Sequence, residues 1–558
     1  MTRSAEMIKD YFDNLQNQRN ELNARMEEIT GLLYPYKQSA SSAMWDTTAS
    51  EACIKLSSLL SSLITPSGQK WHGLAEPLVV SKDDTETKNV RKWCDDVTDT
   101  LFSFRERSSS GFIGCLQAFY ASIVEFGTGC FYIEEDEDED GVKEGIKYIS
   151  IPISDVYVGV NHQNQVDSVY RIFKFTADQI AKKWGEDKLT SRMKTALEKE
   201  DSEEFEFIHA VYPKTMAERK EDFPNSKGAF HSKILSKEDI KFFEENQLNT
   251  LPYVIGRYRV RANEIYGKSP ALEALPAIRR LNEISNELVH YANLALKPPY
   301  IASGDAKQVG FKIKAGQINT GAVNREGKPL FHPLSVGNPL PYYEEVKRIQ
   351  DSIHSLFFLD LFQVLDDKAS RSATESMEKT REKGAFVSPI VGGLQSEFIG
   401  MMIRRELDIL DLQDKLPAFI STDILGNDDP PNISLLKVEY TSPLFKYQQA
   451  ETISSVLQSV NNVIELGAKT GDPSCIDHIN LDEVARIIML GGGSPASTVR
   501  DMSEVIKIRK KRAGQIEQMR QQQIADQQEQ VGVETGAQVA REVMMEKMRA
   551  EMREGSDG

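Results

Sequence analysis

The chain contains 558 residues, with 67 Lys and Arg against 84 Asp and Glu, which gives a formal net charge of −17. The length predicts several domains rather than one core, and 40% hydrophobic with 27% charged residues is a globular composition. The acidic balance argues against a protein that coats nucleic acid, because neutralising phosphates needs a basic face.

Four helices are predicted in the first 126 residues. Apolar side chains recur at three- and four-residue steps over residues 4–33 and again over 46–63, which is the pattern of a helix with one buried face. Two further helices are predicted over residues 84–107 and 111–126.

From residue 129 to 176 the apolar pattern alternates with a period of two, which predicts strands. Thr176 is then expected to cap a short helix. Further strands are predicted at 204–213 and 249–260, so the first 260 residues are expected to form an α+β unit.

Two long helices with a small β-rich module between them are predicted next. Ser269 is a favourable N-cap and Pro270 fits the first helical position, so a helix is expected from 269 to about 297. A second helix is expected over residues 343–365. Between them, residues 300–341 are rich in glycine and proline and contain short β runs.

The remaining chain is predicted to be mostly helical. After a polar segment rich in small residues comes a series of helices at 373–386, 389–412, 445–468 and 480–490, with a strand at 436–441. A final helix is expected to start at Ser497. Its glutamine-rich part, up to residue 530, is polar on all sides, as in a helix that bridges solvent, assembles with others or frays.

Enzyme and metal signatures are weak. Gly267-Lys268-Ser269 imitates the end of a phosphate-binding loop, but Ala262 stands where the first glycine of that loop belongs. The acidic run 134–140 imitates an EF-hand loop, but Lys147 stands where the bidentate acid is needed. A solvated hairpin tip is the favoured interpretation of this run, with a metal site left open. No catalytic residue, cofactor or metal is therefore expected.

The cysteine pattern and the length of the apolar runs predict the environment of the protein. The five cysteines are scattered without a CxxC pair, and no apolar run reaches the roughly 18 residues of a membrane span. A soluble protein without a membrane partner, made in a reducing cytoplasm, is expected.

Several stretches in a fixed order resemble one family, the portal proteins or head-to-tail connectors of short-tailed, podovirus-type bacteriophages. They are Trp45-Asp46-Thr47-Thr48-Ala49, Leu60-Ser61-Ser62-Leu63-Ile64-Thr65-Pro66, Tyr253-Val254-Ile255-Gly256-Arg257-Tyr258, Tyr266-Gly267-Lys268-Ser269-Pro270, Lys297-Pro298-Pro299, Ala373-Thr374-Glu375 and Tyr440-Thr441-Ser442-Pro443-Leu444. The resemblance extends from about residue 30 to residue 512. The acidic hairpin tip and the glutamine-rich tail depart from it.

The resemblance implies an α+β, mainly α fold that assembles as a ring, typically of twelve subunits. Such a subunit has a wing, a stem of two helices, a clip at the end of the stem and a helical crown. On this chain the wing is expected at 1–265 and 377–440, the stem at 266–299 and 342–365, the clip at 300–341, the tunnel loop at 366–376, the crown at 441–530 and a polar tail at 531–558.

The implied function is a channel at one capsid vertex through which double-stranded DNA is packaged and ejected. The implied partners are other copies of the chain, a terminase motor, tail adaptor proteins, and capsid and scaffolding proteins, and the implied location is the virion. The alternative is another oligomeric head-tail adaptor or scaffold without a DNA channel.

Three groups of residues are expected to carry this function. Leu281, Ile284, Ile349 and Ile353 are expected to pack the stem between subunits, unless both helices belong to the core of a single chain. Lys307, Lys312, Lys314, Arg325 and Lys328 would give the clip a basic surface for docking an acidic partner, or would only solubilise it. The resemblance places Lys368 and Arg371 around DNA in the tunnel loop, unless Arg371 forms a helical surface pair with Glu375.

Overall fold

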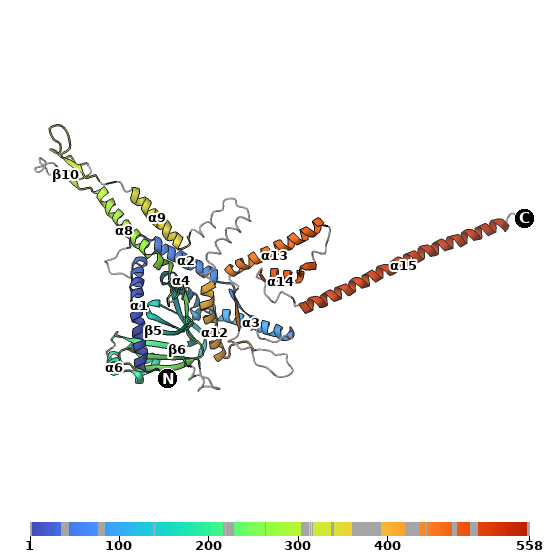
Figure 1. The fold of residues 1–558 in the computed structure, drawn as a ribbon, viewed down its shortest axis with the longest axis horizontal. Coiled ribbons are helices and arrows are strands. Elements are labelled where there is room, and N and C mark those ends of the chain that lie inside the picture. Colours follow the sequence, from blue (N-terminus) through green and yellow to red (C-terminus); the bar gives the residue numbers. More distant parts are fainter. Residues whose placement is uncertain are drawn as a thin grey trace. The chain divides into compact units, whose positions relative to one another are not determined.

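The computed structural model is a mixed helix and sheet protein in which helices predominate (Figure 1). The structure describes residues 3–34, 44–75, 84–137, 141–199, 201–215, 218, 228–262, 264–302, 312, 314, 316–335, 337, 340–359, 392–418, 436–440, 443–470, 477–491, 500 and 502–554. It separates into two compact units, residues 1–451 and 452–558.

The helices account for most of the described chain. They are α1 (Ala5–Leu33), α2 (Thr48–Ile64), α3 (Asp84–Arg105), α4 (Phe112–Phe126), α5 (Ala177–Trp184), α6 (Ser191–Glu198), α8 (Pro270–Leu296), α9 (Leu340–Leu356), α12 (Gly400–Leu412), α13 (Pro443–Thr470), α14 (Leu481–Gly491) and α15 (Met502–Glu554), with a π-helix at Gln395–Ile399 before α12.

The strands form antiparallel sheets in the first unit. They are β1 (His72–Ala75), β2 (Thr128–Glu137), β3 (Lys143–Ile151), β4 (Val156–Val160), β5 (Val166–Thr176), β6 (Glu204–Pro213), β7 (Phe230–Ser236), β8 (Phe242–Leu248), β9 (Tyr253–Arg257), β10 (Tyr300–Ala302), β11 (Phe331–Pro333) and β12 (Lys437–Tyr440). One sheet has the order β3-β2-β9 and another the order β4-β5-β6-β7-β8, while β1 pairs with β12 and β10 with β11.

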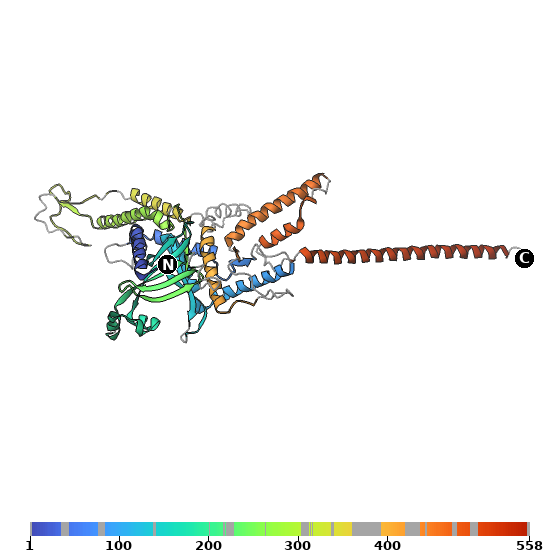
Figure 2. The same cartoon turned by 60° about the horizontal axis from the view of Figure 1, so that its bottom comes forward.

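The main hydrophobic core of the first unit lies where the helices meet the three-stranded sheet. It combines buried side chains of α2, α3, α4, α8, α9 and α12 with those of β2 and β3. Smaller clusters pack α1, α5 and α6 onto the five-stranded sheet. Figures 1 and 2 show α8 and α9 side by side, extending away from the sheets with β10 beyond the end of α8.

The periodicity of the sequence predicted the N-terminal helices correctly. The predictions at 4–33, 46–63, 84–107 and 111–126 match α1 to α4 within a few residues. The expected cap of α5 is present, because Thr176 and Gln179 form a capping box. The prediction of an α+β, mainly helical chain is thus confirmed, whereas the ring and the subdomain boundaries stay predictions.

Some predicted elements differ in the structure. The helix expected over 343–365 is α9, which ends at Leu356, and Phe358 has a positive φ of 57° that a helix cannot contain. The final helix runs unbroken to Glu554, past the expected start of a separate tail at residue 531. The strands β1, β7 and β8 were not predicted. The helix expected at 373–386 lies outside the described residues.

The second unit consists of most of α13 together with α14 and α15. Within it, the guanidinium of Arg509 on α15 donates a 2.8 Å hydrogen bond to the carboxylate of Asp482 on α14. Of the helices that the structure describes, none is both long enough and apolar enough to cross a membrane.

Candidate functional site

The start of α8, the first of the predicted stem helices, is tied to the turn between α4 and β2. The Ser269 hydroxyl accepts a hydrogen bond from the Leu272 amide at 2.9 Å and donates one to the Glu125 carbonyl at 2.7 Å. The Gly267 amide donates to Oγ1 of Thr128 at 3.0 Å. The N-cap therefore fixes both the helix start and its position on the body of the first unit.

Two glycines allow the turn between α4 and β2 to approach the segment before α8 closely. A Cβ on Gly267 would lie 2.1 Å from the carbonyl oxygen of Gly127, and one on Gly127 would lie 2.2 Å from the carbonyl oxygen of Gly267. Gly127 also has a φ of +81°, which favours glycine. Gly267, which belongs to the sequence that resembles the end of a phosphate-binding loop, therefore has a packing role in the structure.

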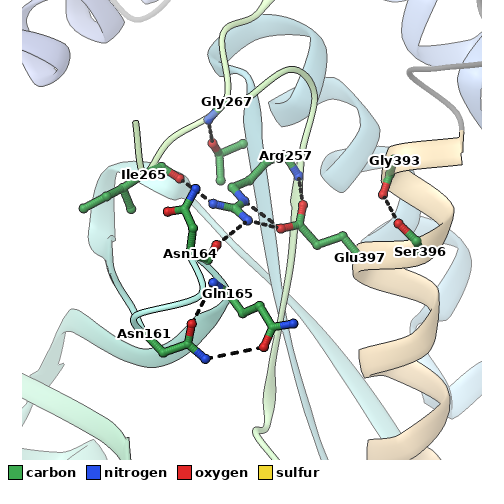
Figure 3. Close-up of polar contacts among 10 residues, drawn as sticks. Asn161, Asn164, Gln165, Arg257, Ile265, Gly267, Gly393, Ser396 and Glu397 are labelled. Atoms are coloured by element: carbon green, nitrogen blue, oxygen red, sulfur yellow. Dashed lines mark hydrogen bonds and ion pairs between the residues drawn. The ribbon is translucent and has the colours of Figure 1, made fainter. Parts of the chain in front are cut away.

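Arg257 at the end of β9 joins this junction to the π-helix, as Figure 3 shows. Its Nε donates to Oε1 of Glu397 at 2.6 Å and its backbone amide donates to Oε2 at 3.0 Å. Its Nη1 donates to the carbonyl oxygen of Ile265 at 3.0 Å, and its Nη2 to that of Asn164 at 3.5 Å. One side chain thus holds the π-helix, the β4–β5 turn and the segment before α8.

The π-helix follows the predicted tunnel loop in the chain and continues directly into α12. Isolated π-turns are rare, and they are found at functional sites more often than elsewhere. Glu397 lies in the middle of this turn, so its contact with Arg257 fixes the helix within the irregular turn. Ser396 adds a 2.9 Å hydrogen bond to the Gly393 carbonyl (Figure 3).

A buried ion pair holds α12 against the body. Nε of Arg105 on α3 donates to Oε1 of Glu406 on α12 at 2.9 Å, and Nη2 donates to Oε2 at 2.5 Å. The hydroxyl of Tyr148 donates to the same carboxylate at 2.5 Å. Burial, followed by the charge of Arg105, holds the pKa of the neighbouring His72 well below its usual value, so His72 is neutral.

The four residues predicted to pack the stem between subunits lie in the core of the single chain. Leu281, Ile284, Ile349 and Ile353 are at most 6% exposed and belong to the main hydrophobic core. Their position fits the alternative of an intramolecular core, and leaves little of these side chains to reach a second subunit. Packing between subunits through these four residues stays a prediction.

The far parts of the same helices expose apolar side chains. No residue of α8 beyond Ile284 is buried, and Leu294 and Leu296 are 50% and 80% exposed. On α9, Leu340 and Tyr343 near the N-terminus are also exposed. The apolar surface available to a neighbour therefore lies at the ends of the stem helices that are remote from the core.

The structure describes four of the five cations predicted for the clip, and Lys307 lies outside the described residues. Lys312, Lys314, Arg325 and Lys328 are all exposed. Lys328 pairs with Glu326 at 3.6 Å. The short β10–β11 ladder and the Val323–Pro329 bridge are the β structure described in this region.

The structure does not reach the predicted tunnel loop. Lys368 and Arg371 lie outside the described residues, as does the whole of 366–376. For the acidic run, the flanking strands are confirmed as β2 and β3, which pair antiparallel. Within the described part of the chain, no three His, Cys, Asp or Glu side chains come together as a metal site would require.

The contacts that position this site join residues far apart in the sequence and were not predicted. Arg257 and Glu397 are separated by 140 residues, and Arg105 and Glu406 by 301. No local pattern links such residues, whereas the Ser269-Pro270 signal did predict the start of α8. Arg257 lies in a stretch that carries the family resemblance, which is the one signal that pointed to it.

Comparison with known proteins places the chain in a family. The family model described as bacteriophage head to tail connecting protein matches residues 5–499. A portal protein of Salmonella phage epsilon15 is 24% identical over 482 residues, which cover 84% of this chain and 82% of that protein. A probable portal protein of Bordetella phage BPP-1 is 22% identical over 505 residues, which cover 88% and 86%. Since the family match spans most of its length, the chain belongs to the bacteriophage head to tail connecting proteins.

Proposed function

We propose that the protein works as a portal protein, the subunit of a ring at one capsid vertex through which double-stranded DNA is packaged and ejected. Membership of the connector family and the names of both curated relatives support this function. They do not favour the alternative of a head-tail adaptor or scaffold without a channel. The family is structural, and the proposed role needs no chemistry in the ring itself.

The observation that best supports ring assembly is the uneven burial of the stem helices. The first part of α8 is anchored in the core of its own chain, while Leu294 and Leu296 are left in solvent. Exposed apolar side chains on a paired helical projection are stabilised when neighbouring copies cover them. A closed ring, with twelve subunits as the expected number, covers these surfaces on every subunit.

The tunnel loop is the proposed DNA contact. Lys368 and Arg371 are the cations of residues 366–376 and, repeated around a ring, would form two positive girdles. Contacts to phosphates carry no sequence information, so DNA of any sequence could pass. Asp366 and Asp367 would weaken the field and keep the contact transient, as translocation requires.

The clip is the proposed docking surface for the terminase motor during packaging and for tail adaptor proteins afterwards. Lys312, Lys314 and Arg325 are exposed on a short β-containing module of a chain with net charge −17. An acidic partner face would complement them, and the association would then weaken with salt. Capsid and scaffolding proteins are the other proposed partners in the virion.

Ring formation can be tested by negative-stain microscopy of the purified full-length chain. We expect rings with a central hole from the unmodified protein, and fewer rings from Leu296→Glu. Asn293→Glu places the same charge on an exposed polar position of the same helix and serves as the control. A protein that stays monomeric under all assembly conditions would contradict the portal function. Rings that form equally with Leu296→Glu would remove the far end of α8 from the interface.

The tunnel loop needs a separate assay of packaging and DNA retention. Lys368→Ala with Arg371→Ala should leave rings intact while packaged DNA is lost. Normal packaging and retention by this double variant would show that the two cations do not hold DNA.

A further inference from the structure

The first part of α15 carries the densest basic cluster of the second unit. Between residues 507 and 512, five of six positions are Lys or Arg, namely Lys507, Arg509, Lys510, Lys511 and Arg512. Six cations and one acid between residues 505 and 525 give this stretch a net charge of +5, in a chain of net charge −17. The cluster is thus opposite in sign to the rest of the molecule.

The helix neutralises little of this cluster from within. Neighbours on a helix surface are three or four residues apart, and Lys510, Lys511 and Arg512 have no acid at those positions. Lys507 has one acid at this spacing, Glu504, three residues before it, and two like charges, Lys510 and Lys511, three and four residues after it. Like charges at this spacing destabilise a helix, so an external anion would stabilise this part of α15.

Within the described residues of the cluster, one cation has an acidic partner. Arg509 forms an ion pair with Asp482 of α14. Residues 506–522 are all exposed, so the remaining ammonium and guanidinium groups lie in solvent.

The lysines of the cluster share one side of the helix. At 3.6 residues per turn, Lys507, Lys510 and Lys511 fall within an arc of about 100°, and Lys507 and Lys511 are about 6 Å apart along the axis. Ile508, Ile516 and Met519 fall on another side. The lysine side continues with Gly514 and Gln518, which are uncharged.

The composition of the lysine side favours a phosphate backbone over an acidic protein. Protein interfaces are centred on buried aromatic or aliphatic anchors, and this side offers none between Lys507 and Gln518. Closely spaced Lys residues suit a ligand that carries one charge per 1.7 Å of its axis, as duplex DNA does.

We propose that Lys507, Lys510 and Lys511 of α15 form a surface that binds the phosphate backbone of double-stranded DNA without reading its sequence. This surface is formed by residues other than those of the tunnel loop. The proposal rests on the portal function for the presence of DNA, but the binding itself is a property of the helix. Contact is held by charge, so it is reversible and weakens with salt.

The test compares two charge-matched variants of the full-length chain. The cluster variant combines Lys507→Gln, Lys510→Gln and Lys511→Gln. The control combines Arg541→Gln, Lys547→Gln and Arg549→Gln on the same helix, where four acids balance four cations between residues 541 and 554. Both lose three positive charges, and only the first loses them from the cluster.

Binding is measured by fluorescence anisotropy with a duplex of about 30 base pairs and arbitrary sequence, between about 50 and 200 mM salt. We expect the cluster variant to bind about tenfold more weakly. The slope of log K against log salt should become less steep by about 2.7, because three phosphate contacts at about 0.9 each are lost. The control should keep the affinity and slope of the unmodified chain.

Two outcomes would overturn the proposal. One is equal affinity and slope for the cluster variant and the unmodified chain. The other is tighter binding of polyglutamate than of DNA by the cluster, which would indicate an acidic protein as the partner. Ring formation is measured separately by microscopy. If rings form but the cluster does not bind DNA, only this surface is rejected. If the cluster binds DNA but no rings form, only the portal function is rejected.

Discussion

The two ends of the stem helices differ in how their side chains are used. At the end near the sheets, α8 buries Leu275, Ile278, Leu281 and Ile284, and hydrogen bonds of Gly267 and Ser269 hold its start. At the far end, apolar side chains such as Leu296 are exposed, and the described residues beyond it include the short strands β10 and β11.

This difference separates what one chain stabilises by itself from what it leaves for other chains. The near end is stabilised by burial and by hydrogen bonds within the first unit. The far end buries little within its own chain, so in the proposed ring neighbouring copies would cover it. Substitutions at the two ends should therefore change different measurements, the stability of the chain in one case and assembly in the other.

The largest effect is expected from breaking the buried ion pair at the near end. Glu406→Ala leaves the Arg105 guanidinium buried without its partner, which should lower the free energy of unfolding by about 3–5 kcal/mol. Chemical denaturation of the full chain, followed by circular dichroism, measures it. Arg105→Met combined with Glu406→Leu should recover most of the loss, and an equally unstable double variant would contradict this explanation.

Substitutions at a buried and at an exposed position of α8 should differ in their effect on the free energy of unfolding by a similar amount. Leu281 is 1% exposed and Leu296 is 80% exposed. Leu281→Ala should therefore cost about 2–5 kcal/mol of stability, while Leu296→Ala should change it by less than about 0.5 kcal/mol. Comparable losses in both variants would show that the far end is buried in the isolated chain as well.

The backbone contact at the start of α8 offers a test that leaves charge and hydrophobicity almost unchanged. Gly267→Ala forces a Cβ to within 2.1 Å of the Gly127 carbonyl oxygen, which should cost about 1–3 kcal/mol through backbone shifts. Gly337→Ala is the control, because a Cβ there has no neighbour within 4 Å. Equal thermal stability of the two variants would contradict the close contact.

Acidification should weaken the five-stranded sheet through His209. Its ring bonds Tyr253 at 2.7 Å and Ser232 at 2.9 Å. Burial, followed by the charges of Arg171 and Lys183, lowers its pKa to about 3.

Since the unfolded chain takes up this proton near pH 6.5, the contribution of His209 is complete above that pH. It is lost progressively as the pH falls toward 3, by about 2 kcal/mol at pH 5. Thermal unfolding of the full chain from pH 7 to 5 measures this loss, and His209→Gln should flatten the profile. Identical profiles would show that His209 does not carry it.

Much of the fold could be predicted because its signals are local. The apolar period defined α1 to α4, and Ser269 before Pro270 defined the start of α8. The strand β7 was missed because its sequence does not alternate: Lys233 is buried and pairs with Glu245 at 2.6 Å, so a charged residue occupies a core position.

The site was harder to predict than the fold. A helical stripe shows that one face is buried, but it does not say whether the covering surface belongs to the same chain. For this reason Leu281 and Ile349 were assigned to the interface between subunits, although both lie in the core of the single chain. Contacts such as Arg257 with Glu397 join distant segments, and no local pattern reports them.

The smallest effect is expected where the near end meets the segment that follows the predicted tunnel loop. Arg257 and Glu397 are largely shielded from solvent and form an ion pair, in which Arg257 donates hydrogen bonds from its backbone amide and its Nε to the Glu397 carboxylate. A double-mutant cycle with Arg257→Gln and Glu397→Gln should give a coupling energy of about 0.5–3 kcal/mol. Hydrogen exchange should rise in residues 392–399, because the π-helix loses the contact that fixes it.

The same variants test whether this contact only stabilises the first unit or also affects the tunnel loop. If it only stabilises the body, both single variants should form rings that package and retain DNA normally. If it also affects the tunnel loop, DNA retention should fall in rings of normal appearance. Additive stability changes and unaltered hydrogen exchange would show that Arg257 does not hold the π-helix.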